Sequence, residues 1–285
     1  MTVASGTSRP AQRRVPPPRR WARLGFRFWS VVAVMLAVVV ATGVFVLRHM
    51  RTSLIPAAAP GWHLTMADDF QSSGLNPSNW WGAYSGQPGG DTNGWWSPSH
   101  VQVGKGMLVL RAYKAATPEG IRYVSGGIGQ VERRAQVYGR YLVRMRTTSG
   151  KGISTVALLF PTGTWPPEID FYEDGPTTSR RDSTAATLHY GPGNHMIQRE
   201  LKGIDLTKWH TFGLDWLPGR LVYTVDGRTW ATVTGSEVPA VPMTLDLQSQ
   251  ALACAGTPSP CPDATTPPEV DTEVAWVAVY QRNGR

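Results

Sequence analysis

The segment WPPEIDFYED, residues 165–174, carries the strongest structural signal in this chain. It places Glu168, Asp170 and Glu173 among β-branched and aromatic residues that are typical of a buried strand. Because side chains alternate between the two faces of a strand, Glu168 and Asp170 share one face, and strict alternation sends Glu173 to the other. One extra residue after Asp170, a β-bulge, would return Glu173 to the acidic face and turn the apolar residues towards the core. Burying unpartnered charges is costly, so the acidic face predicts a functional site rather than packing.

Two glutamates on one face of a strand suit the cleavage of a glycosidic bond. In the bulged strand Glu168 and Glu173 would be roughly 13 Å apart at Cα, and inward-leaning side chains would bring their carboxyl groups near the ~5–5.5 Å of a retaining glycosidase. One carboxylate must be ionised to attack the anomeric carbon, and the other needs a raised pKa to protonate the leaving oxygen. The carboxyl group of Asp170, between them, would help to separate the two pKa values.

The rest of the C-terminal part predicts further strands. Short β-branched and aromatic runs are separated by Gly, Pro, Asn and Asp at residues 107–113, 139–147, 154–160, 184–191, 210–217, 220–227, 243–250 and 272–281. Many of these runs alternate apolar with polar residues, and no segment after residue 60 sustains a helical period. Asp226-Gly227 predicts a hairpin turn. The fold class is therefore all-β, a two-sheet sandwich or jelly roll, although the pattern alone also permits a closed barrel.

Charge divides the chain into two parts. The first 51 residues contain nine Arg and no acidic residue, which leaves 19 basic against 20 acidic residues in the remainder. The formal net charge of +8 therefore belongs to an N-terminal tail. A folded part that is close to neutral argues against a nucleic-acid partner.

The N-terminal segment has the pattern of a membrane anchor. Residues 1–27 read as a basic, disordered cytoplasmic tail, and residues 28–47 form an uncharged apolar run of 20 residues, enough to span about 30 Å of bilayer. Arginines before the run predict a cytoplasmic N-terminus, with 48–60 as linker and 61–285 as an extracytoplasmic domain. A cleaved export signal ending near Ala57-Ala58-Ala59, giving a secreted protein, or a buried core helix are the alternatives.

The two cysteines agree with export. Cys254 and Cys261 bracket a Pro- and Ser-containing loop, CAGTPSPC, and a disulfide between them would close that loop in an oxidising compartment. Two free thiols are the alternative. A zinc site is less favoured, because no His and no second Cys pair lies nearby.

The motif and its surroundings resemble a known family. Residues 168–173, EIDFYE, resemble the bulged E-x-D-x-x-E motif of family 16 glycoside hydrolases, in the form found in laminarinase-like members. WHLTMADDF (62–70) is similar to the opening strand of that family, TLHYG (187–191) to the strand after the catalytic one, and residues 209–227 to its W-H…V-D-G pattern. The resemblance covers essentially all of residues 61–282.

The resemblance implies a concanavalin-like β-jelly roll with an open cleft. The implied activity is endo-acting, retaining hydrolysis of a β-linked polysaccharide, with β-1,3- or mixed-linkage glucan favoured and sulfated galactans among the family's substrates. Glu168 would be the nucleophile, Asp170 the helper and Glu173 the acid/base. A transglycosylase that remodels an envelope glycan would use the same site, whereas a lectin-like module would lose one or more of these acids. A monomer without a cofactor is expected, with structural calcium known in parts of the family.

Further residues are candidates for substrate binding: Trp165, His189, Trp95, Trp96, Gln248 and Gln250. Trp165 lies where a cleft wall is expected and could stack on a sugar ring. His189 falls on the next strand and could hydrogen-bond Glu173 or a sugar hydroxyl, and core packing is the alternative for both residues. The two glutamines alternate on one strand face, and one of the paired tryptophans is expected to pack inward.

Overall fold

The computed structural model describes residues 29, 32–40, 55–89, 93–175, 180–254 and 261–284. The chain divides into two compact units, Met1–Thr52 and Ser53–Arg285. Residues 32–40 of the first unit are helical. None of the helices within the described ranges has the length and apolar character needed to cross a bilayer. Half of the expected anchor at 28–47, and all of the expected tail at 1–27, lie outside the described residues.

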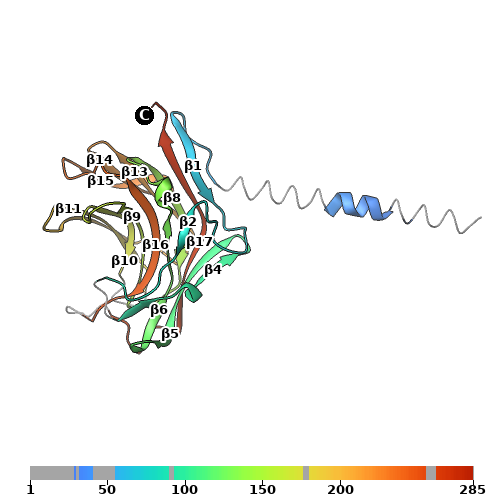
Figure 1. The fold of residues 1–285 in the computed structure, drawn as a ribbon, viewed down its shortest axis with the longest axis horizontal. Coiled ribbons are helices and arrows are strands. Elements are labelled where there is room, and N and C mark those ends of the chain that lie inside the picture. Colours follow the sequence, from blue (N-terminus) through green and yellow to red (C-terminus); the bar gives the residue numbers. More distant parts are fainter. Residues whose placement is uncertain are drawn as a thin grey trace, which may run out of the picture. The chain divides into compact units, whose positions relative to one another are not determined.

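The second unit is built almost entirely from strands (Figure 1). In chain order its elements are β1 (Trp62–Asp68), β2 (Trp80–Ala83), β3 (Gly94–Trp96), η1 (Pro98–His100), β4 (Val101–Gly104), β5 (Met107–Thr117), β6 (Gly120–Ser125), β7 (Gly127–Gln130), η2 (Glu132–Arg134), β8 (Gly139–Thr147), β9 (Ile153–Pro161), β10 (Glu168–Asp174), β11 (Ser183–Tyr190), β12 (His195–Lys202), β13 (His210–Leu217), β14 (Arg220–Val225), β15 (Arg228–Thr234), β16 (Met243–Ala251) and β17 (Glu269–Arg282). Each strand expected from the sequence is present.

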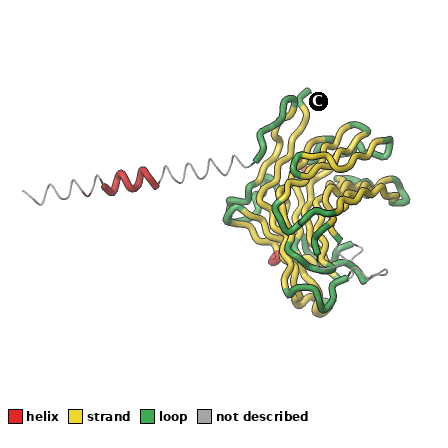
Figure 2. Tube along the Cα trace, turned by 180° about the vertical axis from the view of Figure 1, so that it is seen from behind, coloured by secondary structure: helices red, strands yellow, loops and turns green. Residues whose placement is uncertain are grey.

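The described strands form two separate sheets, which confirms the two-sheet interpretation and argues against a closed barrel. One sheet has ten strands, in the order β15-β14-β13-β8-β17-β5-β6-β3, with β1 added beside β17 and β4 beside β5. The other has seven strands in the order β12-β11-β10-β9-β16-β7-β2. Figure 2 shows the strands of this unit from behind, with loops joining them at their ends. The strand that carries the acidic motif lies inside the seven-stranded sheet, between β9 and β11.

The core is formed by side chains on the inner faces of the two sheets. On β9, Ala157 and Leu159 belong to this core, whereas Val156 and Leu158 alternate with them and face the other way. Tyr141 from the ten-stranded sheet and Leu245 from the seven-stranded sheet are fully buried in the same cluster. Burial of each large apolar side chain contributes about 1.5–3 kcal/mol, so the inner faces hold the sheets together and the outer face of the seven-stranded sheet can carry polar groups.

Two local predictions are confirmed. Asp226 and Gly227 join β14 to β15 with φ angles of 49° and 76°, the left-handed conformation that a two-residue hairpin turn requires. Cys254 and Cys261 form a disulfide, with their Cα atoms 4.7 Å apart. The disulfide closes the loop between β16 and β17, whose residues 255–260 lie outside the described part.

Candidate active site

A β-bulge in β10 brings the acidic residues to one face. Asp170 pairs with Leu158 of β9, but the next pair joins Tyr172 to Ala157, so Phe171 is the extra residue. Phe171 and Tyr172 are both buried and both part of the core. Because two consecutive side chains point inward, Glu173 returns to the outer face. The bulge expected after Asp170 is confirmed.

The three acids line one cleft on the outer face of the seven-stranded sheet, with a volume of about 820 Å³. Of the residues that the sequence singles out, its lining includes Glu168, Asp170, Glu173, Trp165, His189, Trp96, Gln248 and Gln250. Trp95 is not among the described residues that line the cleft. It precedes Trp96 on β3, and neighbouring side chains on a strand point to opposite faces. The lining also has an apolar part, formed by Val156, Leu158 and Phe160.

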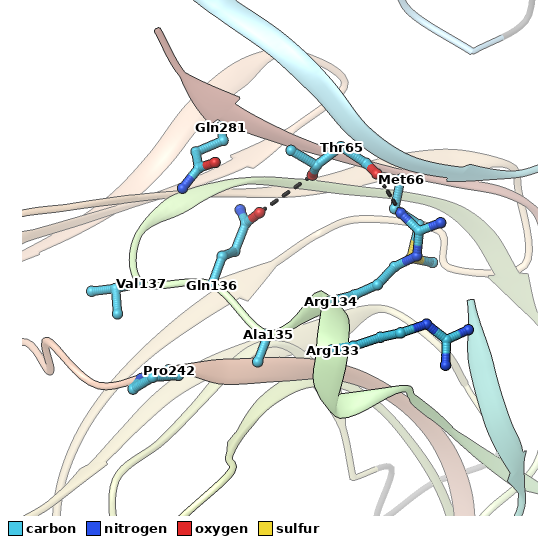
Figure 3. Close-up of a pocket in the computed structure, with 9 residues that line it drawn as sticks. All are labelled: Thr65, Met66, Arg133, Arg134, Ala135, Gln136, Val137, Pro242 and Gln281. Carbon is cyan, nitrogen blue, oxygen red and sulfur yellow. Dashed lines mark hydrogen bonds between the residues drawn. The ribbon is translucent and has the colours of Figure 1, made fainter. Parts of the chain in front are cut away.

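A second cavity of about 500 Å³ has a different character (Figure 3). Its lining includes residues of β1, of the segment after η2 and of the end of β17, and no carboxylate is among its described lining residues. Arg134 donates a hydrogen bond to the carbonyl oxygen of Thr65 at 2.6 Å, and the Thr65 hydroxyl donates to Gln136 Oε1 at 3.3 Å (Figure 3). These hydrogen bonds attach η2 and the segment after it to β1. Because the acidic cleft has the carboxyl groups that this cavity lacks among its described lining residues, the cleft is the better candidate for chemistry.

Asp170 and His189 form a hydrogen-bonded pair in the cleft. His189 Nε2 lies 3.3 Å from Asp170 Oδ2, and its Nδ1 lies 2.8 Å from Asn194 Oδ1. The hydrogen bond to Asp170 raises the pKa of His189 to about 9. Burial raises the pKa of Asp170. The pair therefore holds a proton at neutral pH, beside both glutamates.

The same cluster has the geometry of a candidate metal site. Donor atoms of Glu168, Asp170 and His189 all lie within 4.8 Å of one another. However, a metal needs the neutral imidazole as its ligand, and the raised pKa of His189 favours the protonated ring. These residues fit a proton-holding cluster better than a metal centre.

The two glutamates have different surroundings. The indole N–H of Trp165 donates a hydrogen bond to Glu168 Oε2 at 2.6 Å, which fixes the orientation of this carboxylate. Glu173 Oε2 accepts a hydrogen bond from the Thr187 hydroxyl at 3.0 Å. Burial raises the pKa of Glu173, so this group retains its proton to higher pH than an ordinary glutamate. The two glutamates therefore differ in their hydrogen-bond donors, and Glu173 is the one whose pKa is raised by burial.

Sequence reasoning misses three aromatic or acidic cleft residues: Trp81, Tyr84 and Asp246. Asp246 precedes Gln248 and Gln250 on β16 at the same two-residue spacing, so the alternation that singles out the glutamines also contains it. No comparable local signal marks Trp81 or Tyr84, because only the pairing of β2 with β7 brings them to the cleft.

The fold and the cleft together define a class: a two-sheet β-jelly roll with an acidic cluster on the outer face of one sheet. Within that class the comparisons are specific. The model of the glycosyl hydrolases family 16 matches residues 89–273, and the chain belongs to that family.

Individual relatives agree with this assignment. The chain is 26% identical over 186 residues to a β-glucanase of Rhodothermus marinus, covering 59% of this chain and 64% of the relative. It is 27% identical over 152 residues to the endo-1,3-1,4-β-glycanase ExsH of Rhizobium meliloti, covering 50% of this chain and 32% of the relative. The chain thus spans less than two thirds of either of these curated relatives. The structure of an endo-β-1,3-glucanase from Pyrococcus furiosus superposes with a TM-score of 0.70 at 25% identity, covering 80% of this chain and 99% of the other.

Proposed function

We propose that this protein is an endo-acting retaining glycoside hydrolase that cleaves a β-linked glucan by double displacement. The observation that carries the proposal is the bulge in β10, which sets Glu168 and Glu173 on one cleft face with Asp170 between them. Two carboxyl groups flanking a scissile bond, one ionised and one protonated, are the requirement of this chemistry. Family membership and the β-glucanase relatives support the same reaction.

Each acid has a defined role in this mechanism. Glu168, oriented by Trp165, attacks the anomeric carbon while Glu173 gives its proton to the leaving oxygen, and a glycosyl ester forms on Glu168. Glu173 then takes a proton from water, which attacks the anomeric carbon and releases Glu168. The raised pKa of Glu173 suits the first step, because the acid must be protonated at the moment of bond cleavage. Asp170 and His189 hold a proton beside the reacting groups.

The charge of the cleft favours a neutral polymer. Four carboxyl groups and no Lys or Arg are found among the described lining residues. Like charges repel, so a sulfated galactan would be disfavoured relative to an uncharged glucan. The similar proteins include an endo-1,3-1,4-β-glycanase and an endo-β-1,3-glucanase, which supports a β-1,3- or mixed-linkage glucan as the substrate.

The test is an assay of the full chain on laminarin, lichenan, xyloglucan, agarose and carrageenan, with products identified by mass. Glu168→Gln is the control, because it preserves shape and removes the nucleophile. We expect short oligosaccharides from laminarin or lichenan and none from the control protein. Products longer than the donor would instead indicate a transglycosylase, and binding without cleavage would indicate a lectin. Cleavage of carrageenan would contradict the neutral substrate.

We also propose that residues 28–47 anchor the protein in a membrane, with the jelly roll on the extracytoplasmic side. The support is the uncharged run of 20 residues flanked by arginines. Membrane fractionation should leave the full chain in the pellet after a high-salt wash. A soluble mature form that begins near residue 60 would favour the cleaved signal instead.

A further inference from the structure

Two glycines on β7 make room for two aromatic rings beside the cleft. A Cβ atom at Gly127 would lie less than 3.0 Å from the ring of Tyr84, and one at Gly129 would lie less than 3.0 Å from the indole nitrogen of Trp81. No side chain larger than hydrogen fits at either position without displacing a ring. The rings of Trp81 and Tyr84 therefore lie directly against the backbone of β7.

The rings form one aromatic surface that faces the cleft. Trp81 and Tyr84 stack with their centroids 5.7 Å apart and an interplanar angle of 23°. Trp96 meets Tyr84 edge-on at 4.9 Å, and all three residues line the cleft. Trp81 is 59% exposed, a large apolar surface for a side chain in a globular protein. Exposed aromatic faces of this kind suit the apolar C–H surfaces of sugar rings.

Asp246 holds Tyr84 in this arrangement. The Tyr84 hydroxyl donates a hydrogen bond to Asp246 Oδ2, although the two residues are 162 positions apart in the sequence. Burial raises the pKa of Asp246 to about 7, although the hydrogen bond from Tyr84 acts in the opposite direction. A buried carboxyl group is costly to retain for packing alone, so its contact with Tyr84 points to a positioning role.

The strand register places this surface at a defined distance from the acids. Asp170 of β10 pairs with Leu158 of β9, Leu158 with Asp246 of β16, and Asp246 with Gly129 of β7. Adjacent strands are ~4.8 Å apart, so Gly129 lies about 14 Å from Asp170 across the sheet. Trp165 is on the opposite side of the acids, with its ring centroid 6.1 Å from that of His189 of β11. A chain that crosses the strands would contact both aromatic walls.

We propose that Trp81 and Tyr84 form a platform for a glycosyl unit some distance from the scissile bond, and that Asp246 is the positioning residue that holds Tyr84 in it. The proposal rests on the proposed function. It implies that the enzyme selects neutral glucan chains long enough to reach from the acids to β7. Short substrates lose the contact with the platform and gain nothing from Asp246.

The experiment compares kcat/KM on laminarin with kcat/KM on a chromogenic aryl β-glucoside disaccharide that is too short to reach the platform. Asp246→Leu and Trp81→Ala should each lower the value for laminarin about 10- to 100-fold, mainly through KM, and change the value for the short substrate less than about twofold. Asp246→Asn retains an acceptor for the Tyr84 hydroxyl and should restore most of the laminarin value. Tyr84→Phe, which removes only that hydroxyl, should resemble Asp246→Leu, and the double variant should be no worse than either.

The matched control is Ile121→Ala, which truncates a comparably exposed apolar side chain (67%) outside the described cleft lining. It should leave both values unchanged. An equal loss on both substrates in Asp246→Leu would mean a structural role and would overturn the proposal, as would an unchanged laminarin value.

A binding measurement separates the platform from the proposed reaction. Glu168→Gln protein is titrated with long and short β-glucan oligosaccharides, so that no cleavage is needed for a readout. If the long oligosaccharide binds more tightly than the short one, and Trp81→Ala abolishes this difference, the platform is supported even if the wild-type protein cleaves no glucan. Equal binding of the long and short chains refutes it.

Discussion

The two ends of the acidic strand β10 use buried carboxylates in opposite ways. Asp174, at the last position, contacts Arg181 at 2.7 Å, the Thr155 N–H at 2.6 Å and the Tyr172 hydroxyl at 2.8 Å. Asp170, four residues earlier, is equally buried, yet its Oδ1 has no hydrogen-bond partner among the described residues. Asp174 thus has a cation and several hydrogen-bond donors around it, whereas one oxygen of Asp170 lacks a donor among the described residues.

Within the seven residues of β10, Asp174 therefore stabilises the fold, whereas Asp170 and Glu173 line the cleft. Asp174 is paired with a guanidinium and accepts several hydrogen bonds, and the pair ties β10 to the segment that leads into β11. The cleft acids have fewer donors, so burial raises the pKa of Asp170 and of Glu173. A carboxyl group that must gain and lose a proton during a reaction cannot have both oxygens occupied by permanent hydrogen-bond donors.

The largest effect is expected at the cleft end of the strand. Glu168→Ala should lower kcat at least about 10³-fold, because it removes the carboxylate proposed to form the glycosyl ester, while the melting temperature changes little. Added azide should restore part of the activity and release a glycosyl azide of inverted configuration, detected by mass and NMR. Retained activity, or rescue without this product, would contradict the assignment of the nucleophile.

Breaking the other end should affect stability and spare the chemistry. Arg181→Met leaves Asp174 buried without its cation and should destabilise the fold by about 3–5 kcal/mol in urea unfolding, with kcat nearly unchanged below the transition. The control is the neighbouring Arg180→Met, whose pair with Asp182 is largely exposed and should change stability by less than about 1 kcal/mol. A large loss of kcat in folded Arg181→Met protein would remove the distinction between the two ends.

The smallest expected effect is a shift in the pH dependence of kcat/KM when a hydrogen-bond donor to Glu173 is removed. The Thr187 hydroxyl donates to the Glu173 carboxylate, which favours the ionised form and lowers its pKa. Thr187→Val removes this donor, so the pKa rises further and the protonated, active acid persists to higher pH. The alkaline limb of the kcat/KM profile should therefore move to higher pH. Thr184→Val loses hydrogen bonds to backbone atoms of Glu173 and Ala185 and none to the Glu173 carboxylate, so it should not move the limb. A shift to lower pH in Thr187→Val would contradict the role of Glu173.

Several features of the site are predictable because they are local. The alternation of side chains and the position of the bulge follow from six consecutive residues, 168–173, and both are present in the structure. The turn at Asp226-Gly227 and the disulfide are equally local. Trp95 and Trp96 are harder to interpret from sequence. Alternation predicts that their side chains point to opposite faces of the strand, but it does not predict which of them faces the cleft.

The all-β class, the shared face of the three acids and the family resemblance can all be read from the chain alone, because each rests on short segments whose patterns are local. The distant residues that complete the cleft emerge only when the sheets are assembled. Tyr84 and Asp246 are 162 positions apart and meet because β2, β7 and β16 are neighbours in one sheet. Strand order is set by the packing of whole sheets against a common core, and no local pattern encodes it.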